Sequence, residues 1–315
     1  MHVPGHVIDP RLEVAAALGA AAVVASVVRD ARRAPERTGS TLLAEPHRAS
    51  AQAATAGLVF ALQMVNVPVL PGTSGHLLGG ALATALVGPR RALLAISSVI
   101  AVQALLFADG GLQALGVNLL LIAVLPVAVA TLARRRFGGP AGDMGWTALA
   151  VGAAAAPVVS AAAFSALYAA GGSSAPFSRV AAAMIGTHAA VAVAEVVITM
   201  AAVALIATAR TRFRVTDVAT VWSVAAVAAV GLSTAASSAP DGLTKVMGDL
   251  HVAIGGPGSI LSAAPLAGYT VGGLDGLWST SMAGALGLVA TAAACTVLAL
   301  ASRSPLRTTR APVAS

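Results

Sequence analysis

Cysteine and charged residues are scarce in this sequence of 315 residues. Its one cysteine, Cys295, excludes a disulfide framework and a cluster of thiolate metal ligands within the chain. Only 10% of the residues are charged, against 57% that are hydrophobic, and the mean hydropathy is +0.87. This composition excludes an ordinary water-soluble domain and indicates a membrane protein.

Lysine is scarcer still, because 18 of the 19 basic residues are arginine. These arginines are scattered between apolar runs and form no basic face, so the net charge of +7 does not indicate a nucleic-acid partner. The sequence also lacks the Gly-x-x-x-x-Gly-Lys-Ser/Thr, His-Glu-x-x-His and Gly-x-Ser-x-Gly motifs. We therefore expect no enzyme and no ATP hydrolysis by the chain itself.

Long apolar runs predict an all-α polytopic membrane protein, since about 20 apolar residues cross a bilayer as a helix. The third run is short and glycine-rich, which is typical of irregular backbone that faces protein or a cavity. The nine predicted spans lie near residues 12–28, 52–70, 74–88, 92–108, 112–133, 146–170, 180–209, 216–236 and 279–301.

The arginines predict the orientation, because basic residues accumulate on the cytoplasmic side. With the N-terminus outside and the C-terminus in the cytoplasm, 16 of the 19 basic residues fall inside, and Arg11, Arg179 and Lys245 remain outside. The first residues lack the positive region of a signal peptide, so we expect Met1 to be retained. A basic connector near residues 209–216 divides the chain into a seven-span module, 1–212, and a two-span module, 213–315.

The first two residues carry three nitrogen donors. The Met1 amine, the His2 backbone nitrogen and the His2 imidazole can enclose a cation in fused five- and six-membered chelate rings. A near-planar nitrogen set suits Ni(II) or Cu(II), with Co(II) possible, whereas Mg(II) and Ca(II) prefer oxygen. A solvated terminal histidine is the alternative interpretation.

His76 is the candidate for a fourth nitrogen ligand. It follows Gly-Thr-Ser-Gly, residues 72–75, on the same outer side as Met1, and the glycines allow close approach of an N-terminal strap. A hydrogen-bonded structural histidine is the alternative. His6 is either a capture ligand at the entrance or an exposed loop residue.

Other polar residues lie within or beside the apolar runs. Asn66 and Gln103 either orient His76 or form packing hydrogen bonds between helices. His188 and Glu195 share one helix face, about 10 Å apart, where we favour a structural role. The outer-loop residues Asp241 and His251 either gather cations or are solvated.

Six motifs lie in residues 1–120: Met-His at 1–2, FALQMVNVPV at 60–69, GTSGHL at 72–77, GGAL at 79–82, QALLFADGGL at 103–112 and ALGVN at 114–118. With these motifs the chain resembles the cobalt/nickel S components of energy-coupling factor transporters, CbiM and NikM, and the resemblance continues more loosely to about residue 212. The chain departs from the family after Met-His, where an acidic residue and Gly-Phe-Leu are usual and Val-Pro-Gly-His stands here.

In the C-terminal module, residues 238–243 read Ser-Ala-Pro-Asp-Gly-Leu and are followed by Thr244. With this motif, in which Thr244 stands in place of glutamate, the module resembles the PDGLE domain, an accessory component of the CbiN/NikN kind, and residues 265–269 resemble the outer loop of that domain. The functional expectation for this module depends on the resemblance, since Pro-Asp-Gly alone indicates only a turn.

The resemblance implies a substrate-specific component of an ATP-driven importer in the bacterial cell membrane. It implies that Met1, His2 and His76 hold a transported Ni(II) or Co(II) ion, with no resident cofactor. The implied partners are a transmembrane coupling protein, the T component, and cytoplasmic ATPases. The alternative is a metal-permeable channel or membrane metal sensor that works without ATPases.

Overall fold

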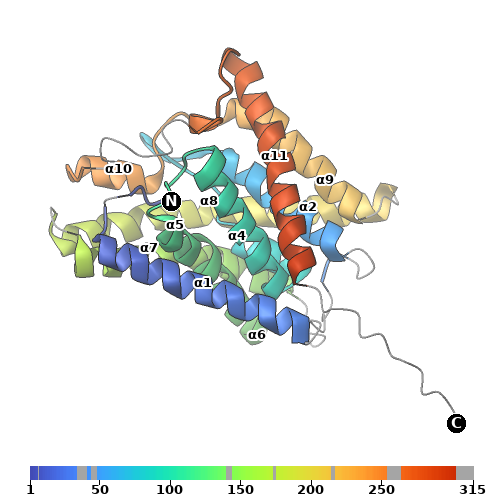
Figure 1. Cartoon of the computed structure of the whole chain (residues 1–315). Coiled ribbons are helices and arrows are strands. Elements are labelled where there is room, and N and C mark those ends of the chain that lie inside the picture. The colour runs from blue at the N-terminus through green and yellow to red at the C-terminus, as the bar shows by residue number, and fades with distance from the viewer. Residues whose placement is uncertain are drawn as a thin grey trace, which may run out of the picture.

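The computed structural model describes residues 1–5, 7–33, 41–43, 48–139, 144–172, 175–213, 217–253 and 264–302. These residues fold mainly into helices, with one small two-stranded sheet (Figure 1). The longer helices are α1 (Pro10–Arg33), α2 (Arg48–Met64), α4 (Pro89–Leu106), α6 (Leu125–Phe137), α7 (Trp146–Gly171), α8 (Phe177–Phe213), α9 (Asp217–Ala226) and α11 (Gly276–Ala301). The shorter elements are β1 (Val67–Leu70), β2 (Thr73–Gly75), α3 (Gly80–Val87), α5 (Leu115–Asn118) and α10 (Gly242–Asp249).

Within the described residues, seven helical segments are long and apolar enough to cross a membrane. Apolar side chains on their outer surfaces are exposed, for example Leu18 on α1 (69%) and Val193 on α8 (65%), as expected for contact with lipid. The chain is therefore a multi-pass membrane protein, as predicted. The segments are Pro10–Arg33, Pro89–Leu106, Leu115–Phe137, Trp146–Gly171, Phe177–Ala209, Val218–Ala235 and Gly276–Ala301.

The predicted second and third spans are helical over only part of their length. α2 ends at Met64, and the chain then forms an antiparallel hairpin in which Pro68 of β1 lies opposite Ser74 of β2. Pro68 lacks the N–H that a continuing helix would need, and Gly72 turns the chain with φ +68°. The helix prediction was therefore wrong from residue 65 to residue 70 and from 74 to 79, where apolar content concealed a hairpin and a loop.

α3 is the most deeply buried helix, with all eight of its residues buried, and a helix of this length spans about 12 Å. It packs against α2, α4, α6 and α7. Gly80 allows α6 to approach closely, because a Cβ at this position would lie 2.5 Å from the Cβ of Pro126. Surrounding protein therefore covers this short element.

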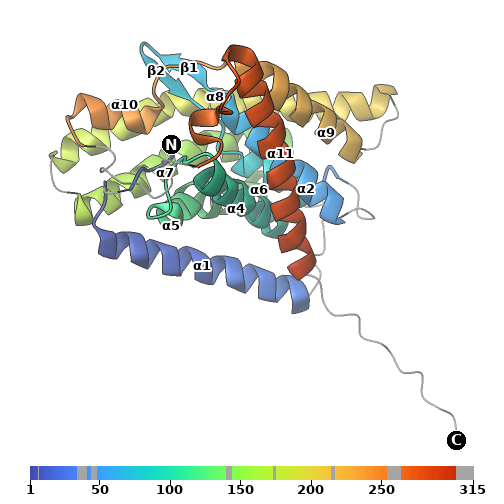
Figure 2. The same ribbon diagram turned by 45° about the horizontal axis from the view of Figure 1, so that its top comes forward.

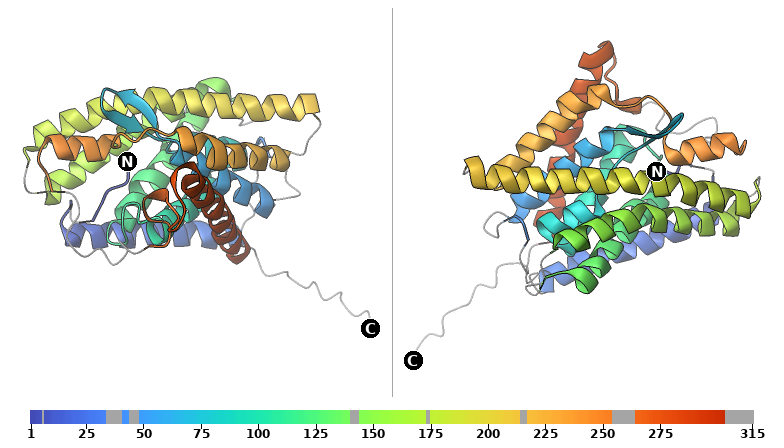
Figure 3. Two further views of the ribbon diagram at one scale, coloured as in Figure 1. Left: turned by 90° about the horizontal axis from the view of Figure 1, so that it is seen from above. Right: turned by 180° about the vertical axis from the view of Figure 1, so that it is seen from behind.

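The N-terminus lies inside the arrangement of helices rather than at its edge (Figures 1 and 2). α1 runs along one side of the molecule (Figure 2). Residues 1–5, which precede α1, lie away from this helix, on the side of the hairpin and α10 (Figure 2). α9 and α11 pack against α2, and α10 packs against α8. In both views of Figure 3, α10 lies beside the N-terminus. Segments from both ends of the chain meet there.

Candidate metal centre

The N-terminal segment is held inside the protein by Asn118 at the end of α5. The Oδ1 of Asn118 accepts the Val3 N–H at 2.7 Å, and its Nδ2 donates to the Val3 carbonyl at 3.0 Å. Gly110, with φ +81°, leaves room for this clamp, since a Cβ there would lie 2.3 Å from Nδ2 of Asn118 and 3.4 Å from Cβ of His2. The clamp places the Met1 amine in the interior, where Met1 is 4% exposed.

His76 follows β2 at the start of a loop. Its Nδ1 lies 3.0 Å from the Leu77 carbonyl oxygen. A carbonyl can only accept, so Nδ1 carries the proton and Nε2 keeps its lone pair. Glu195 of α8 fixes the following backbone, since its carboxylate accepts the N–H groups of Leu78 at 2.6 Å and Gly79 at 2.9 Å.

The Met1 amine and Nε2 of His76 are 2.6 Å apart. The imidazole of His2 stacks on that of His76, with ring centroids 5.2 Å apart and an interplanar angle of 28°. Both histidines are 7% exposed. The structure thus brings together the three residues that the sequence singled out as metal ligands.

Gln103 orients the ring of His2. Its Oε1 lies 3.1 Å from Nε2 of His2, and an amide oxygen accepts, so Nε2 carries the proton and Nδ1 has a lone pair. Nδ1 lies 3.4 Å from Oδ2 of Asp109, which in turn accepts the hydroxyl of Tyr269 at 2.7 Å. The side-chain amide of Gln103 also donates to that hydroxyl oxygen, at 3.3 Å.

Asp241 connects the C-terminal part of the chain to the N-terminus. Its Oδ2 pairs with the Met1 amine at 2.7 Å, and its Oδ1 accepts the Thr244 N–H at 2.8 Å, which caps α10. The preceding backbone joins the hairpin, because Ser74 donates its N–H to the Pro240 carbonyl at 2.9 Å. Asp241 is therefore part of the site, contrary to the alternative of a solvated loop residue.

Burial favours the neutral form of both histidines. It lowers the pKa of His2 despite the opposing effect of Asp109, and it lowers the pKa of His76 well below 6.5, with a further decrease from the Met1 ammonium. Burial alone would raise the pKa of Asp241, but the Met1 ammonium holds it well below its usual range. Neutral imidazoles are the forms that can donate lone pairs to a metal ion.

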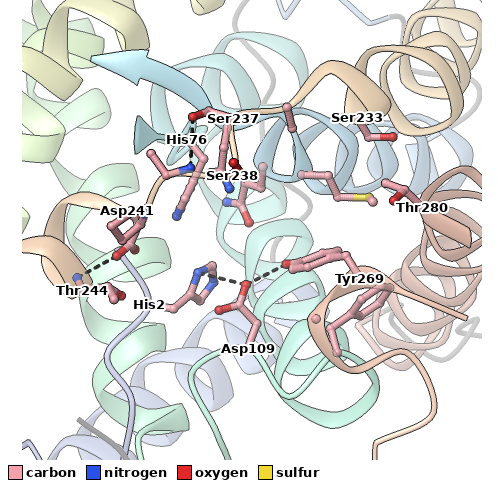
Figure 4. Close-up of a pocket in the computed structure, with 18 of the residues that line it drawn as sticks. His2, His76, Asp109, Ser233, Ser237, Ser238, Asp241, Thr244, Tyr269 and Thr280 are labelled. Atoms are coloured by element: carbon pink, nitrogen blue, oxygen red, sulfur yellow. Dashed lines mark hydrogen bonds and ion pairs between the residues drawn. The ribbon is translucent and has the colours of Figure 1, made fainter. Parts of the chain in front are cut away.

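The histidines line a cavity of about 600 Å³, shown in Figure 4. His2, Asp109 and Tyr269 lie together on one side of it, and Asp241 and Thr244 lie beside each other at another (Figure 4). Among the described residues, no three His, Cys, Asp or Glu side chains are placed to hold a metal ion. A metal site here would therefore need donors other than these side chains, and the Met1 amine, 2.6 Å from Nε2 of His76, is one such donor.

The remaining candidates have different positions. Gln103 contacts His2 rather than His76, and Asn66, whose backbone carbonyl accepts the Ser237 N–H at 2.8 Å, lines the cavity. His251 is exposed and does not line the cavity. His6 lies outside the described residues.

His188 and Glu195 are both buried on α8. The Nδ1 of His188 donates to the Met184 carbonyl at 2.8 Å, and its ring lies near Gly242, the first residue of α10. The carboxylate of Glu195 accepts the N–H groups of Leu78 and Gly79, in the loop that follows His76. The structural role predicted for this pair agrees with these contacts, and Glu195 acts close to the site.

Three residues of the site were missed as candidates by sequence reasoning: Asp109, Asn118 and Tyr269. Asp241 was a candidate for gathering cations, but its contact with the Met1 amine was not predicted. Asp109 and Asn118 belong to motifs of the first 120 residues, so a signal for them existed. Tyr269 lies 160 residues from Asp109, its hydrogen-bond partner, and no local pattern predicts that contact.

Residues 2–213 match the family described as "Cobalt uptake substrate-specific transmembrane region". This chain belongs to that family. The match covers about two thirds of the 315 residues and includes His2 and His76. It ends at the last residue of α8, close to the predicted boundary between the modules.

Relatives of this cobalt uptake family member are named for metal transport. A protein of Haloquadratum walsbyi named for metal transport is 37% identical over 158 residues, which is 49% of this chain and 68% of that protein. A protein of Archaeoglobus fulgidus named as a fused nickel transport protein, NikMN, is 49% identical over 74 residues, 24% of this chain and 25% of its own length.

One solved structure shares the fold. It is titled as a transition metal transporter, is 22% identical, and aligns with a TM-score of 0.50 over 67% of this chain and 95% of its own. At this identity the likeness shows the arrangement of helices alone.

Proposed function

We propose that this chain is the substrate-specific component of an energy-coupling factor importer and captures Ni(II) or Co(II) from outside the cell. Membership of the cobalt uptake family and the names of the relatives support metal uptake. The observation that carries the proposal is the 2.6 Å contact between the Met1 amine and Nε2 of His76, with the His2 ring stacked beside it.

The proposed ligands are four nitrogen atoms: the Met1 amine, the His2 amide nitrogen, Nδ1 of His2 and Nε2 of His76. The first three form a five-membered and a six-membered chelate ring. Gln103 and the Leu77 carbonyl leave the two imidazole nitrogens as lone-pair donors. An all-nitrogen set of this kind suits Ni(II) and Co(II) and disfavours Mg(II) and Ca(II), and it does not by itself select between nickel and cobalt.

Charge balance favours a divalent ion. Binding removes one proton from the Met1 ammonium and one from the His2 amide, so a divalent cation replaces two protons and the net charge of the site is unchanged. Asp241, 2.7 Å from the amine, then compensates the same charge before and after binding. Asp109 lies 3.4 Å from Nδ1 of His2, where a cation bound to that nitrogen would be attracted to its carboxylate.

We assign residues 1–212 as the capture module and residues 213–315 as an accessory module fused to it. Asp241 and Tyr269 of the second module contact residues of the first, which supports a joint site.

We also propose nine membrane segments, formed by the seven long helical segments with the buried α2 and α3, with Met1 outside and the C-terminus in the cytoplasm. Because the sequence has no phosphate-binding loop for ATP, energy would come from cytoplasmic ATPases through a T component.

Equilibrium dialysis of the purified protein with Ni(II) or Co(II), followed by metal analysis, tests the site. The parent should bind one ion per chain, and His76→Ala should lower the affinity more than about 100-fold, beyond the loss caused by removing an outer partner of a ligand. His251→Ala is the control, since this histidine is exposed. Equal affinities of His76→Ala and the parent would contradict the proposal.

Uptake in cells tests the proposed partners. Inactivating the ATPase should stop metal accumulation. Accumulation that persists would instead favour a channel or sensor.

Labelling with an impermeant thiol reagent tests the topology, in a Cys295→Ser background. His251→Cys should react from outside and Arg136→Cys should not, although both side chains are exposed. The reverse pattern would contradict the proposed orientation.

A further inference from the structure

Asp109, which follows α4, presents its carboxylate to the proposed ligands. Its backbone N–H donates to the Gln103 carbonyl at 3.1 Å, which fixes the turn after the helix. The preceding residue, Ala108, has φ +56°, a left-handed conformation that is uncommon for a residue with a Cβ and is found more often at functional sites. The Asp109 side chain lines the cavity and is 26% exposed, so an ion in the cavity can reach it.

Two hydrogen bonds hold this carboxylate toward His2, as Figure 4 shows for the bond from Tyr269. The Tyr269 hydroxyl donates to Oδ2 of Asp109 at 2.7 Å. The side-chain amide of Gln103 donates to the same hydroxyl at 3.3 Å, which directs the hydroxyl hydrogen to Asp109. Oδ2 retains a second lone pair, and it lies 3.4 Å from Nδ1 of His2.

Metal binding changes the contact between His2 and Asp109. When Nδ1 of His2 gives its lone pair to an ion, no hydrogen lies between this nitrogen and Oδ2, and the two electron-rich atoms need a cation that interacts with both. Neighbouring ligands bound at about 2.1 Å around one ion lie roughly 3.0 Å apart. The 3.4 Å between Nδ1 and Oδ2 and the 2.6 Å between the Met1 amine and Nε2 of His76 are both near this value. The carboxylate is therefore close enough to bind the ion directly.

Asp241 also lines the cavity, but its surroundings differ. Its Oδ2 pairs with the Met1 amine at 2.7 Å. An amine that has lost one proton to bind a metal ion still carries two N–H groups, so Asp241 keeps a hydrogen-bond donor in the complex. His2 offers no such donor to Asp109. The geometry thus distinguishes Asp109 from the other carboxylate.

We infer that Asp109 is a fifth ligand, a carboxylate oxygen outside the plane of the four nitrogen atoms, and that it favours Co(II) over Ni(II). The inference rests on the proposed function, because it adds a ligand to the proposed nitrogen set. Ni(II) in a plane of four nitrogen atoms, one of them a deprotonated amide, pairs its eight d electrons and binds further ligands weakly. Co(II), with seven d electrons, readily takes a fifth ligand. The added oxygen therefore supplies the selection that the nitrogen set lacks.

Equilibrium dialysis of the full chain with Co(II) alone and with Ni(II) alone, without oxygen, tests this inference. In Asp109→Asn we expect the Co(II) affinity to fall more than about 10-fold and the Ni(II) affinity less than about threefold, since 10-fold is the smallest loss usual for an outer partner of a ligand. Asparagine keeps the size of the side chain and an oxygen for Tyr269, and retained Ni(II) binding shows that the variant is folded.

Asp241→Asn is the matched control, because it removes the same charge from the wall of the same cavity. Its affinities for the two metals should change by one common factor, since a loss of charge alone acts equally on two divalent ions. The visible absorption of bound Co(II) is a second measurement, because its intensity depends on the coordination number. The parent should give the spectrum of a five-coordinate ion, and Asp109→Asn a different one.

Three results would overturn the fifth ligand. They are equal losses for both metals in Asp109→Asn, which would show that Asp109 acts only through His2; no loss for Co(II); and identical Co(II) spectra of the parent and this variant. Each would leave the dependence of binding on His76 intact, whereas failure of the proposed function would abolish that dependence.

Discussion

The two ends of the chain contribute different kinds of atoms to the same cavity. Residues 1–118 contribute the nitrogen atoms proposed as ligands, from Met1, His2 and His76, together with the amides of Gln103 and Asn118 that hold them and one carboxylate, Asp109. Residues 237–269 contribute oxygen atoms, from Asp241 and Tyr269. In the proposed site, the N-terminal part would coordinate the metal, and the C-terminal part would balance charge and fix orientation.

Removing the side chain that orients His2 should cause the larger loss of metal affinity. Gln103→Leu frees the ring of His2 from its partner at 3.1 Å, and we expect a loss of about 10- to 100-fold in metal affinity, as for other partners of metal-bound histidines. Equilibrium dialysis measures it, with Gln52→Leu as the buried-glutamine control. An unchanged affinity would show that packing alone orients the ring.

Removing the charge from the C-terminal part should have a smaller effect. Asp241→Asn keeps a side chain that caps α10 and removes the ion pair with the amine at 2.7 Å. Since the site has the same net charge with and without the metal, we expect less than about a 10-fold change in affinity. Asp249→Asn, at an exposed ion pair with Lys245, is the control. A loss above 100-fold would instead place Asp241 among the metal ligands.

The pH dependence of stability should show the smallest effect. The pKa values of His2 and His76 are lowered in the folded protein from 6.5. The unfolded chain therefore takes up protons below about pH 6.5 that the folded chain does not, and stability present above this pH is lost as the pH falls. We expect a lower Tm of the metal-free protein at about pH 5 than at about pH 7.5.

The control for this pH dependence is His76→Gln, in which one of the two titrating groups is absent. The difference in Tm between the two pH values should be smaller in that variant. An equal difference would contradict the assignment of His76 as a neutral buried residue.

Helix positions and the three nitrogen-bearing residues could be predicted from the sequence, and for separate reasons. Apolar runs such as 146–170 set the helices, because their length matches the bilayer. Met1, His2 and His76 were predicted as candidate ligands from the nitrogen donors that they carry and from motifs that resemble a known family. The hairpin at 67–75 was missed because its residues are mostly apolar, although Pro68 and Gly72 were signals against a helix.

The contacts of the C-terminal part could not be predicted. Asp241 is 240 residues from Met1 in sequence, and Pro-Asp-Gly alone indicates only a turn. Its position at the amine depends on the backbone contact between Ser74 and Pro240, which is set by tertiary packing. The contacts of Glu195 are also set by tertiary packing, because it accepts N–H groups from a loop more than 100 residues earlier in the sequence.

The most direct test of the central claim is metal binding by a protein with residues added before Met1. One added residue converts the amine into a peptide nitrogen and places chain where Asp241 and His76 now contact that amine. We predict that the extended protein loses Ni(II) and Co(II) binding although all six histidines remain, and that a protease that restores Met1 as the first residue restores binding. An extension at the C-terminus, as the control, should have no effect. Full binding by the uncleaved protein would contradict coordination by the N-terminal amine.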